Sequence, residues 1–270
     1  MLKIQSIIKS RSFMYSMLVL LFSIPLISFA QLASPNRDGV SMGHLHFLAA
    51  DLEASNEFWE AFGASTVQNG PLSMHAVPGV FILVREVQPS SGSDGTMIVH
   101  VGFHVPDVNA AFDRWTAAGI DVERGAFPIQ LWVHGPDGLL IEILENPEID
   151  VPVQMHHIHW NIPEIEAMQA WYDDMFGAVP GMRGDFQAGD IPGVNLTFSG
   201  ADMPLANTQG TVLDHIGFEV TDLQATIARL EAAGVSMDSG YREIPAANLA
   251  IAFLTDPWGT YIELTQGLEP

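Results

Sequence analysis

Histidines recur in pairs along this 270-residue chain, within runs that alternate between polar and apolar residues. His44 and His46 stand two residues apart, as do His157 and His159, and residues two apart on a strand share one face of a sheet. Neutral imidazoles bind divalent metals and move protons near neutral pH. The chain has no cysteine, which excludes disulfides, thiolate metal sites and a cysteine nucleophile. Any metal chemistry must therefore use histidine and carboxylate side chains.

The segments that carry these histidines repeat along the chain. Residues 43–48 (GHLHFL) match residues 156–161 (HHIHWN), and residues 100–119 match residues 215–234 without a gap. Internal similarity of this kind indicates a repeated structural unit. The repeats predict two tandem domains that divide near residues 147–152.

Each half of the chain also divides internally. His44 and His100 each open an alternating run typical of a strand, and each run leads through an acidic residue into a segment with helical spacing. Asp107 is placed as the N-cap of the second such helix. Shorter apolar stretches broken by Gly and Pro follow, at residues 80–84 and 130–133, and are typical of strands in hairpins. The sequence therefore predicts a β-α-β-β-β module that occurs four times.

Four stretches give the chain a family resemblance. They are HIHWNI at residues 157–162, WYDDMFGA at 171–178, DHIGFEV at 214–220 and DPWGTYIEL at 256–264. On these residues the chain resembles the vicinal oxygen chelate superfamily, over about residues 41–268. That superfamily includes glyoxalase-type lyases, epimerases, extradiol dioxygenases and antibiotic-resistance proteins. The resemblance implies an α+β fold of two tandem domains, each of two βαβββ modules that form an open cup-shaped sheet. The expected divisions are a linker at residues 31–40, a first domain at 41–148 and a second domain at 149–270.

The resemblance also implies a divalent metal ion in the cup, held by the first strand of each module and the last strand of the second. The matching positions are His157, His215 and Glu263 in the second domain, and His44, His100 and Glu142 in the first. Two imidazoles and one carboxylate form a facial triad that leaves about three octahedral positions open. Fe, Zn, Mn, Ni and Co all suit such a site, and the sequence does not choose among them.

Several neighbouring side chains have alternative roles. His46 and His159 share a face with the matched histidines, so each could be a ligand, a hydrogen-bond donor to a ligand, a proton shuttle or a residue that only lines the cup. His156 is expected to point to the other face, at the surface. We favour the second domain as the reactive one, with His159 and Glu219 as catalytic residues, because an imidazole or acid then remains free to move a proton.

The reaction class stays open between two kinds of enzyme and a binder. Residues 80–84 and 194–198 contain no acid where glyoxalase-type enzymes place a further carboxylate, which suits a three-ligand site like that of extradiol dioxygenases. Those enzymes have lost the triad in their first domain, whereas this chain keeps it. We predict a metal-dependent enzyme that chelates a small substrate through vicinal oxygens, extradiol dioxygenase-like or glyoxalase-like. The alternative is a non-catalytic protein that sequesters a small ligand.

The first thirty residues and the net charge bear on location and partners. Lys3, Lys9 and Arg11 precede an apolar run at residues 13–29 that ends in small residues, which is typical of a signal peptide spanning residues 1–30. An uncleaved membrane anchor is the alternative. The remaining chain has 7 basic and 32 acidic residues, a formal charge of −25, and no lysine. We expect a periplasmic or secreted protein with a small-molecule substrate, no nucleic-acid partner and no stable membrane association after cleavage. A homodimer remains an open alternative.

Overall fold

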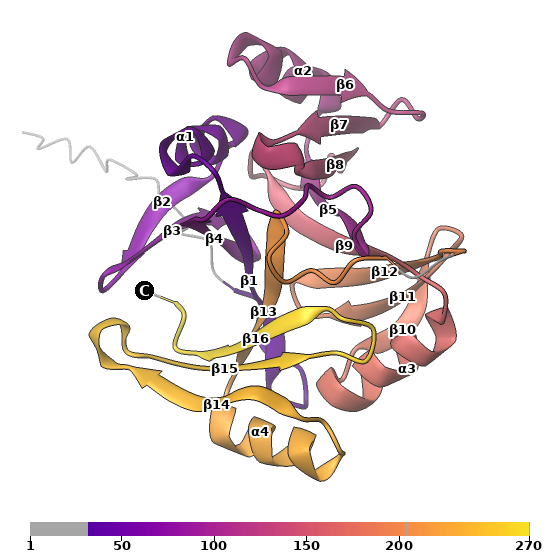
Figure 1. Ribbon diagram of the computed structural model, residues 1–270. Helices are drawn as coiled ribbons and strands as arrows, with labels where there is room; N and C mark the ends of the chain where they lie inside the picture. Colours follow the sequence, from indigo (N-terminus) through magenta and orange to yellow (C-terminus); the bar gives the residue numbers. More distant parts are fainter. Residues whose placement is uncertain (1–31, 203–204, 270) are drawn as a thin grey trace, which may run out of the picture.

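The computed structural model describes residues 32–202 and 205–269, so the signal peptide predicted at residues 1–30 lies outside the described residues. Four βαβββ modules follow one another along the chain, as the repeats predict (Figure 1). The first two modules comprise β1 (Val40–Ala49), α1 (Leu52–Phe62), β2 (Ser65–Asn69), β3 (Leu72–Val77) and β4 (Val80–Glu86), then β5 (Ile98–Val105), α2 (Val108–Ala117), β6 (Asp121–Arg124), β7 (Gln130–His134) and β8 (Leu140–Glu145). The last two comprise β9 (Gln154–Ile162), α3 (Ile165–Phe176), β10 (Val179–Arg183), β11 (Phe186–Ile191) and β12 (Val194–Gly200), then β13 (Leu213–Val220), α4 (Leu223–Ala232), β14 (Met237–Ile244), β15 (Leu249–Thr255) and β16 (Tyr261–Gln266).

Acidic side chains start three of the four helices. Asp51, Asp107 and Asp222 each accept hydrogen bonds from backbone N–H groups in the first helical turn, which otherwise have no partner. The helix α3 begins after Glu164 without such a side-chain bond. The N-cap predicted at Asp107 is confirmed.

The strands form two eight-stranded mixed sheets whose composition the repeats do not reveal. One sheet has the order β14-β15-β16-β13-β1-β4-β3-β2, and the other has the order β10-β11-β12-β9-β5-β8-β7-β6. The first module therefore shares a sheet with the fourth, and the second with the third. The central contacts are antiparallel, between β1 and β13 and between β5 and β9. The α+β fold of paired βαβββ modules is confirmed, but each sheet takes one module from each half of the chain.

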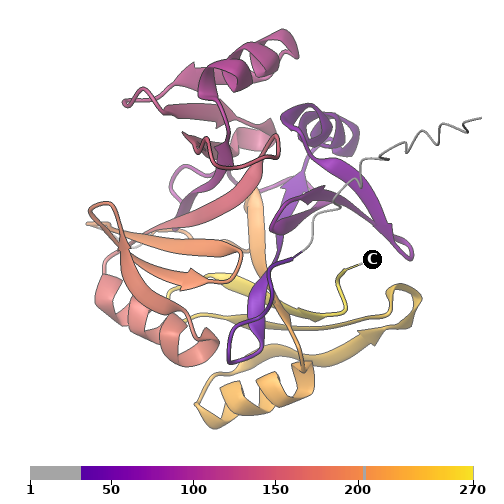
Figure 2. The ribbon, with the colours of Figure 1, turned by 180° about the vertical axis from the view of Figure 1, so that it is seen from behind.

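Both sheets curve, and the four helices pack on their convex sides (Figures 1 and 2). Trp59 of α1 and Trp115 of α2 belong to one large hydrophobic cluster that joins the helices to both sheets. We call the concave face of the sheet centred on β1 and β13 cup A, and the concave face of the sheet centred on β5 and β9 cup B. In the described residues, no helix has the length and apolar character needed to cross a membrane.

Candidate metal centre

Cup A brings together one residue from each of three strands. His44 on β1 and His215 on β13 both direct Nε2 at Oε2 of Glu263 on β16, at 3.0 and 2.9 Å respectively. All three side chains are buried. Two donors that bind one ion at about 2.1 Å, at right angles, lie about 3 Å apart. The two nitrogen–oxygen distances are therefore those expected for ligands of a single metal ion, and all three donor atoms lie within 4.8 Å of one another.

A glycine makes the position of His44 possible. A Cβ atom on Gly217 would lie 2.0 Å from Cε1 of the His44 ring, so only glycine leaves room for the imidazole at this point of β13. Gly102 on β5 plays the same part for His157, whose Cε1 would lie 1.9 Å from an added Cβ. Sequence reasoning missed both glycines, although each stands two residues after a candidate ligand in the repeated motif H-x-G.

Asp214 orients His215 from behind the centre. Its Oδ2 accepts a hydrogen bond from Nδ1 of His215 at 2.7 Å, which leaves Nε2 of that ring free to face Glu263. Burial lowers the pKa of His215, but the hydrogen bonds to Asp214 and Glu263 outweigh it and raise the pKa overall. Burial likewise raises the pKa of Glu263, and the hydrogen bonds from His215 and His44 more than reverse this, so the carboxylate stays ionised. Asp214 precedes the matched histidine directly, a signal that the sequence analysis did not use.

His46 is the fourth side chain of cup A. It pairs with His215 across β1 and β13, and the two ring centroids are 4.4 Å apart. A nitrogen of His46 lies within 4.8 Å of the donor atoms of His44, His215 and Glu263. Neither of its ring nitrogens has a hydrogen-bond partner among the described residues. Burial lowers the pKa of His46 to about 3, so the ring is neutral at pH 7 and offers one unprotonated nitrogen.

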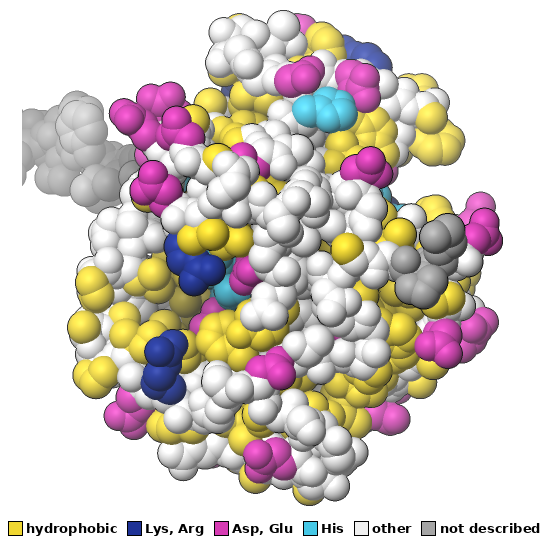
Figure 3. Space-filling view, in the orientation of Figure 1, with side chains coloured by type: hydrophobic (Ala, Val, Ile, Leu, Met, Phe, Trp, Pro, Cys, Tyr) yellow, Lys and Arg dark blue, Asp and Glu magenta, His cyan; other side chains and the backbone are white. Residues whose placement is uncertain are grey.

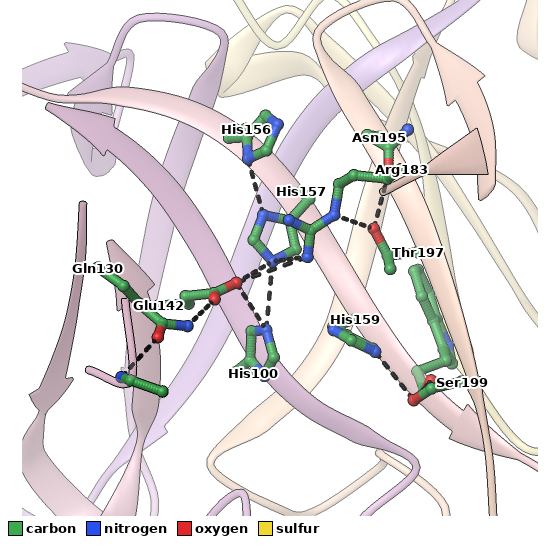
Figure 4. A network of polar contacts seen from close by, with 12 residues as sticks. His100, Gln130, Glu142, His156, His157, His159, Arg183, Asn195, Thr197 and Ser199 are labelled. Carbon is green, nitrogen blue, oxygen red and sulfur yellow. Dashed lines mark hydrogen bonds and ion pairs between the residues drawn. The ribbon is translucent and has the colours of Figure 1, made fainter. Parts of the chain in front are cut away.

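Cup B repeats the same donor arrangement with its own residues (Figure 4). Oε2 of Glu142 on β8 lies 3.3 Å from Nε2 of His100 on β5 and 3.0 Å from Nε2 of His157 on β9. The two Nε2 atoms are 3.2 Å apart. Gln130 on β7 donates a hydrogen bond to the other oxygen of Glu142.

An arginine also enters cup B. The guanidinium of Arg183 on β10 places Nη2 at 3.1 Å from Nε2 of His157 and at 3.5 Å from Oε2 of Glu142. Its Nε donates to the hydroxyl of Thr197 at 2.8 Å. Burial lowers the pKa of Arg183, while Glu142 raises it. The sequence analysis assigned no role to Arg183, and nothing in its local motif indicated one.

The structure splits the predicted ligand sets. The sequence analysis grouped His157 with His215 and Glu263, and it grouped His44 with His100 and Glu142. Both groupings are wrong, because modules from opposite halves share each sheet. All six residues lie in the two clusters, but His44 and His157 have exchanged places. The reactive site predicted within the second domain therefore does not form from these residues.

The two predicted catalytic residues lie on strands of different sheets. His159 is in cup B, where its Nε2 contacts the hydroxyl of Ser199 at 2.9 Å and its ring lies 4.7 Å from that of His100. Glu219 accepts hydrogen bonds from the hydroxyl of Thr265 and from the backbone of Gly267 and Leu268. These bonds hold the chain after β16, a structural role for Glu219.

His156 is partly buried and does not lie free at the surface as expected. Its Nδ1 is 2.9 Å from Nδ1 of His157, and its ring stacks on His104 with the centroids 3.8 Å apart. Burial lowers the pKa of His156 to about 2. His156 therefore supports His157 from behind.

A cavity of about 370 Å³ opens beside the cup A cluster. Phe253 and Tyr261 form one wall, stacked with their ring centroids 5.1 Å apart, and His215, Asp214 and Arg85 also line it. Figure 3 shows this face hollowed, with histidine, acidic and basic side chains among hydrophobic ones. A small molecule in this cavity can reach the edge of the cluster.

The fold and the paired donor clusters define a class of proteins in which βαβββ modules build open cups with room for a metal ion. Comparison with known proteins makes the relationship specific. A sequence model of the Glyoxalase/Bleomycin resistance protein/Dioxygenase superfamily matches residues 41–143 and 154–264. The chain belongs to this superfamily, which confirms the resemblance inferred from its motifs.

Solved structures share this fold at low sequence identity. Glyoxalase I from Zea mays has a TM-score of 0.66 at 14% identity, with 84% of this chain and 92% of that chain covered. A Bacillus subtilis protein named as a candidate dioxygenase has a TM-score of 0.61 at 14% identity, with 88% and 86% covered. At this identity the likeness concerns the fold alone. A search among curated proteins finds no significant match.

Proposed function

We propose that cup A holds a divalent metal ion and binds a small substrate through two adjacent oxygen atoms, so that the chain is a metal-dependent enzyme. The observation that carries this proposal is the convergence of His44, His215 and Glu263 at 2.9–3.0 Å beside an open cavity. Two imidazoles and one carboxylate leave about three positions of an octahedral ion for substrate or water. An ion held there supplies Lewis-acid activation of the bound oxygens.

The residues of cup A have separate tasks in this proposal. His44, His215 and Glu263 hold the ion, and Asp214 keeps His215 in the tautomer that presents Nε2. Phe253 and Tyr261 form a flat apolar wall for the carbon frame of the substrate. This wall favours a small, flat substrate.

His46 takes the proton-transfer role that the sequence analysis gave to His159 and Glu219. Its nitrogens have no partner among the described residues, and its ring lies next to His215. The ring can remove a proton from a carbon beside an activated carbonyl and return it to the neighbouring carbon when the negative charge of a bound substrate offsets the burial that lowers its pKa. This arrangement favours glyoxalase-like or isomerase chemistry over ring cleavage.

The test is a screen of the metal-loaded protein against 1,2-dicarbonyl adducts and catechols. We expect turnover of a dicarbonyl adduct without oxygen uptake. His46→Gln is expected to reduce kcat by about 100-fold, within the range of general acid–base catalysis, while metal content stays unchanged. His75→Gln is the matched control, because His75 is also buried but bonds to Asn56 on α1, outside both cups. Oxygen consumption with a catechol would assign dioxygenase chemistry instead, and binding without turnover would make cup A a sequestering site.

Export and the domain boundary remain proposals. The basic and apolar character of residues 1–30 supports a cleaved signal peptide, and the repeats support a boundary near residues 148 and 149. Mass spectrometry of protein recovered from the periplasm or medium is expected to show a chain that begins at Gln31. A recovered chain that still begins at Met1 would contradict cleavage.

A further inference from the structure

Cup B has the donor spacing of a metal site but a different electrostatic content. In cup A, Glu263 and Asp214 contribute two carboxylates, and no arginine contacts His44, His215 or Glu263 in the part of the chain that the structure describes. In cup B, Glu142 is paired with the guanidinium of Arg183. A divalent cation is therefore attracted to cup A, whereas the charge of cup B is already balanced.

Arg183 also occupies the donor atom that a metal needs. A neutral imidazole nitrogen has one lone pair, and the N–H of Arg183 lies 3.1 Å from Nε2 of His157, the atom that faces Glu142 and His100. An ion bound by these three residues would compete with the guanidinium for that lone pair. The positive charge of the guanidinium would also repel the ion. Water screens this repulsion only weakly, because the Arg183 side chain is only 19% exposed.

Two further contacts hold Arg183 in this position. Its Nε donates to Thr197, and Thr197 in turn donates to Asn195 at 2.7 Å. Thr197 and Asn195 stand on β12 opposite His159 and His157, so the same strand pair that presents His157 also anchors the arginine. The guanidinium is thus held in place in cup B by a strand that forms the cup.

Cup B also lacks the carboxylate that orients a ligand in cup A. The residue before His215 is Asp214, and the residue at the same place before His100 is Val99. Gln130 instead donates to Glu142 and thereby occupies one of its oxygens. The missing carboxylate weakens a metal centre, whereas the bond from Gln130 leaves Oε2 of Glu142, the atom that faces the histidines, free.

We infer that Arg183 is the resident cation of cup B and excludes a divalent metal from His100, His157 and Glu142. The chain then binds one metal ion, in cup A. This inference concerns the second cup and stands independently of the reaction proposed for the first.

The experiment counts Co(II) bound per chain after equilibrium dialysis, with circular dichroism to verify folding. The wild type is expected to bind one ion, and His44→Ala/His215→Ala to bind none. Arg183→Gln is expected to bind two ions, and Arg183→Gln in the His44→Ala/His215→Ala background to bind one. Arg183→Lys is the matched control, because it keeps the positive charge, and it is expected to bind one.

Two results would overturn the inference. One is a wild type that binds two ions and loses one of them on His157→Ala, a result that does not require any Arg183 variant to fold. The other is a folded Arg183→Gln protein that gains no ion in either background. A wild type that binds no ion, with Arg183→Gln binding one in the cup A double variant, would reject the metal site of cup A and still support the role of Arg183.

Discussion

Cups A and B share a donor geometry and differ in almost everything around it. In each, two histidines and one glutamate converge with their donor atoms about 3 Å apart, and in each a glycine makes room for one imidazole. Behind the second histidine stands Asp214 in cup A and Val99 in cup B. The module thus sets where the ligands lie, while single neighbouring residues set the charge that a metal ion meets.

The two cups also differ in the strands that lie beside the histidines. On β4, Phe81 and Leu83 lie opposite His44 and His46, whereas on β12 Asn195 and Thr197 lie opposite His157 and His159. Cup A also contains a small hydrophobic cluster to which Phe81 and Leu83 belong. An apolar wall around a charged centre favours a small organic substrate in cup A, while the polar wall of cup B serves to anchor Arg183.

The largest expected effect comes from removing equivalent histidines. His215→Ala is expected to weaken metal binding by more than 100-fold and to abolish activity, because it removes one of three ligands. His100→Ala in cup B is expected to leave both unchanged. Metal content and turnover of the two variants check this prediction, and loss of activity in His100→Ala alone would reverse the assignment of the cups.

Replacing each of the two glycines by alanine compares the cups through substitutions that cause similar steric clashes. Gly217→Ala and Gly102→Ala each put a methyl group into an imidazole ring, so both are expected to lose about 1–3 kcal/mol of unfolding free energy. Only Gly217→Ala displaces His44 and is expected to reduce metal affinity. Denaturant unfolding and metal titration measure the two effects separately. Equal loss of metal in both variants would mean that both cups bind it.

Asp214→Asn tests the charge behind the ligand. The asparagine amide is neutral and holds the proton of His215 on Nδ1 less firmly than the carboxylate does. Metal affinity is therefore expected to fall by about 10- to 100-fold. The fold is expected to persist, because the side chain stays similar in size. Competition titration against a chelator of known affinity gives the change, and an unaltered affinity would show that Asp214 does not support the centre.

The smallest expected effect is a difference in pH dependence in the metal-free protein. Burial lowers the pKa of His159 to about 3 from an ordinary 6.5, so the unfolded chain binds its proton more readily. Stability is therefore expected to fall as the pH drops below 6.5, by about 1 kcal/mol for this residue between pH 6.5 and 5.5. His159→Gln is expected to remove this slope.

His215 is expected to act in the opposite direction, because its pKa is raised in the folded state. Its contribution to stability is present below pH 6.5 and is lost as the pH rises through the raised value. His215→Gln therefore removes a stabilisation that is present in acid and declines above pH 6.5, whereas His159→Gln removes a loss of stability that develops below pH 6.5. Unfolding measured at several pH values, in the presence of a chelator, decides between these signs. If both substitutions changed the pH dependence of stability in the same direction, the environments assigned to His159 and His215 would be wrong.

The helices and strands of this protein follow largely from patterns among residues that are close together in the sequence. Alternating residues, acidic N-caps and helical spacing predicted the four βαβββ modules, and the aligned repeats identified His44, His100, His157, His215, Glu142 and Glu263. What was wrong was the grouping of these residues. The assignment of catalysis to His159 and Glu219 depended on that grouping, and the structure places them on different sheets.

Local sequence specified the modules and their donors because caps, turns and strand faces depend on residues only a few positions apart. Only the tertiary structure decided which modules share a sheet. The first strands of all four modules have similar alternating patterns, so local pattern does not distinguish the pairing of β1 with β13 from a pairing within each half. The same holds for Arg183, which reaches Glu142 from a strand in another module. Its effect on a metal ion arises from distance and burial, and these exist only in the folded chain.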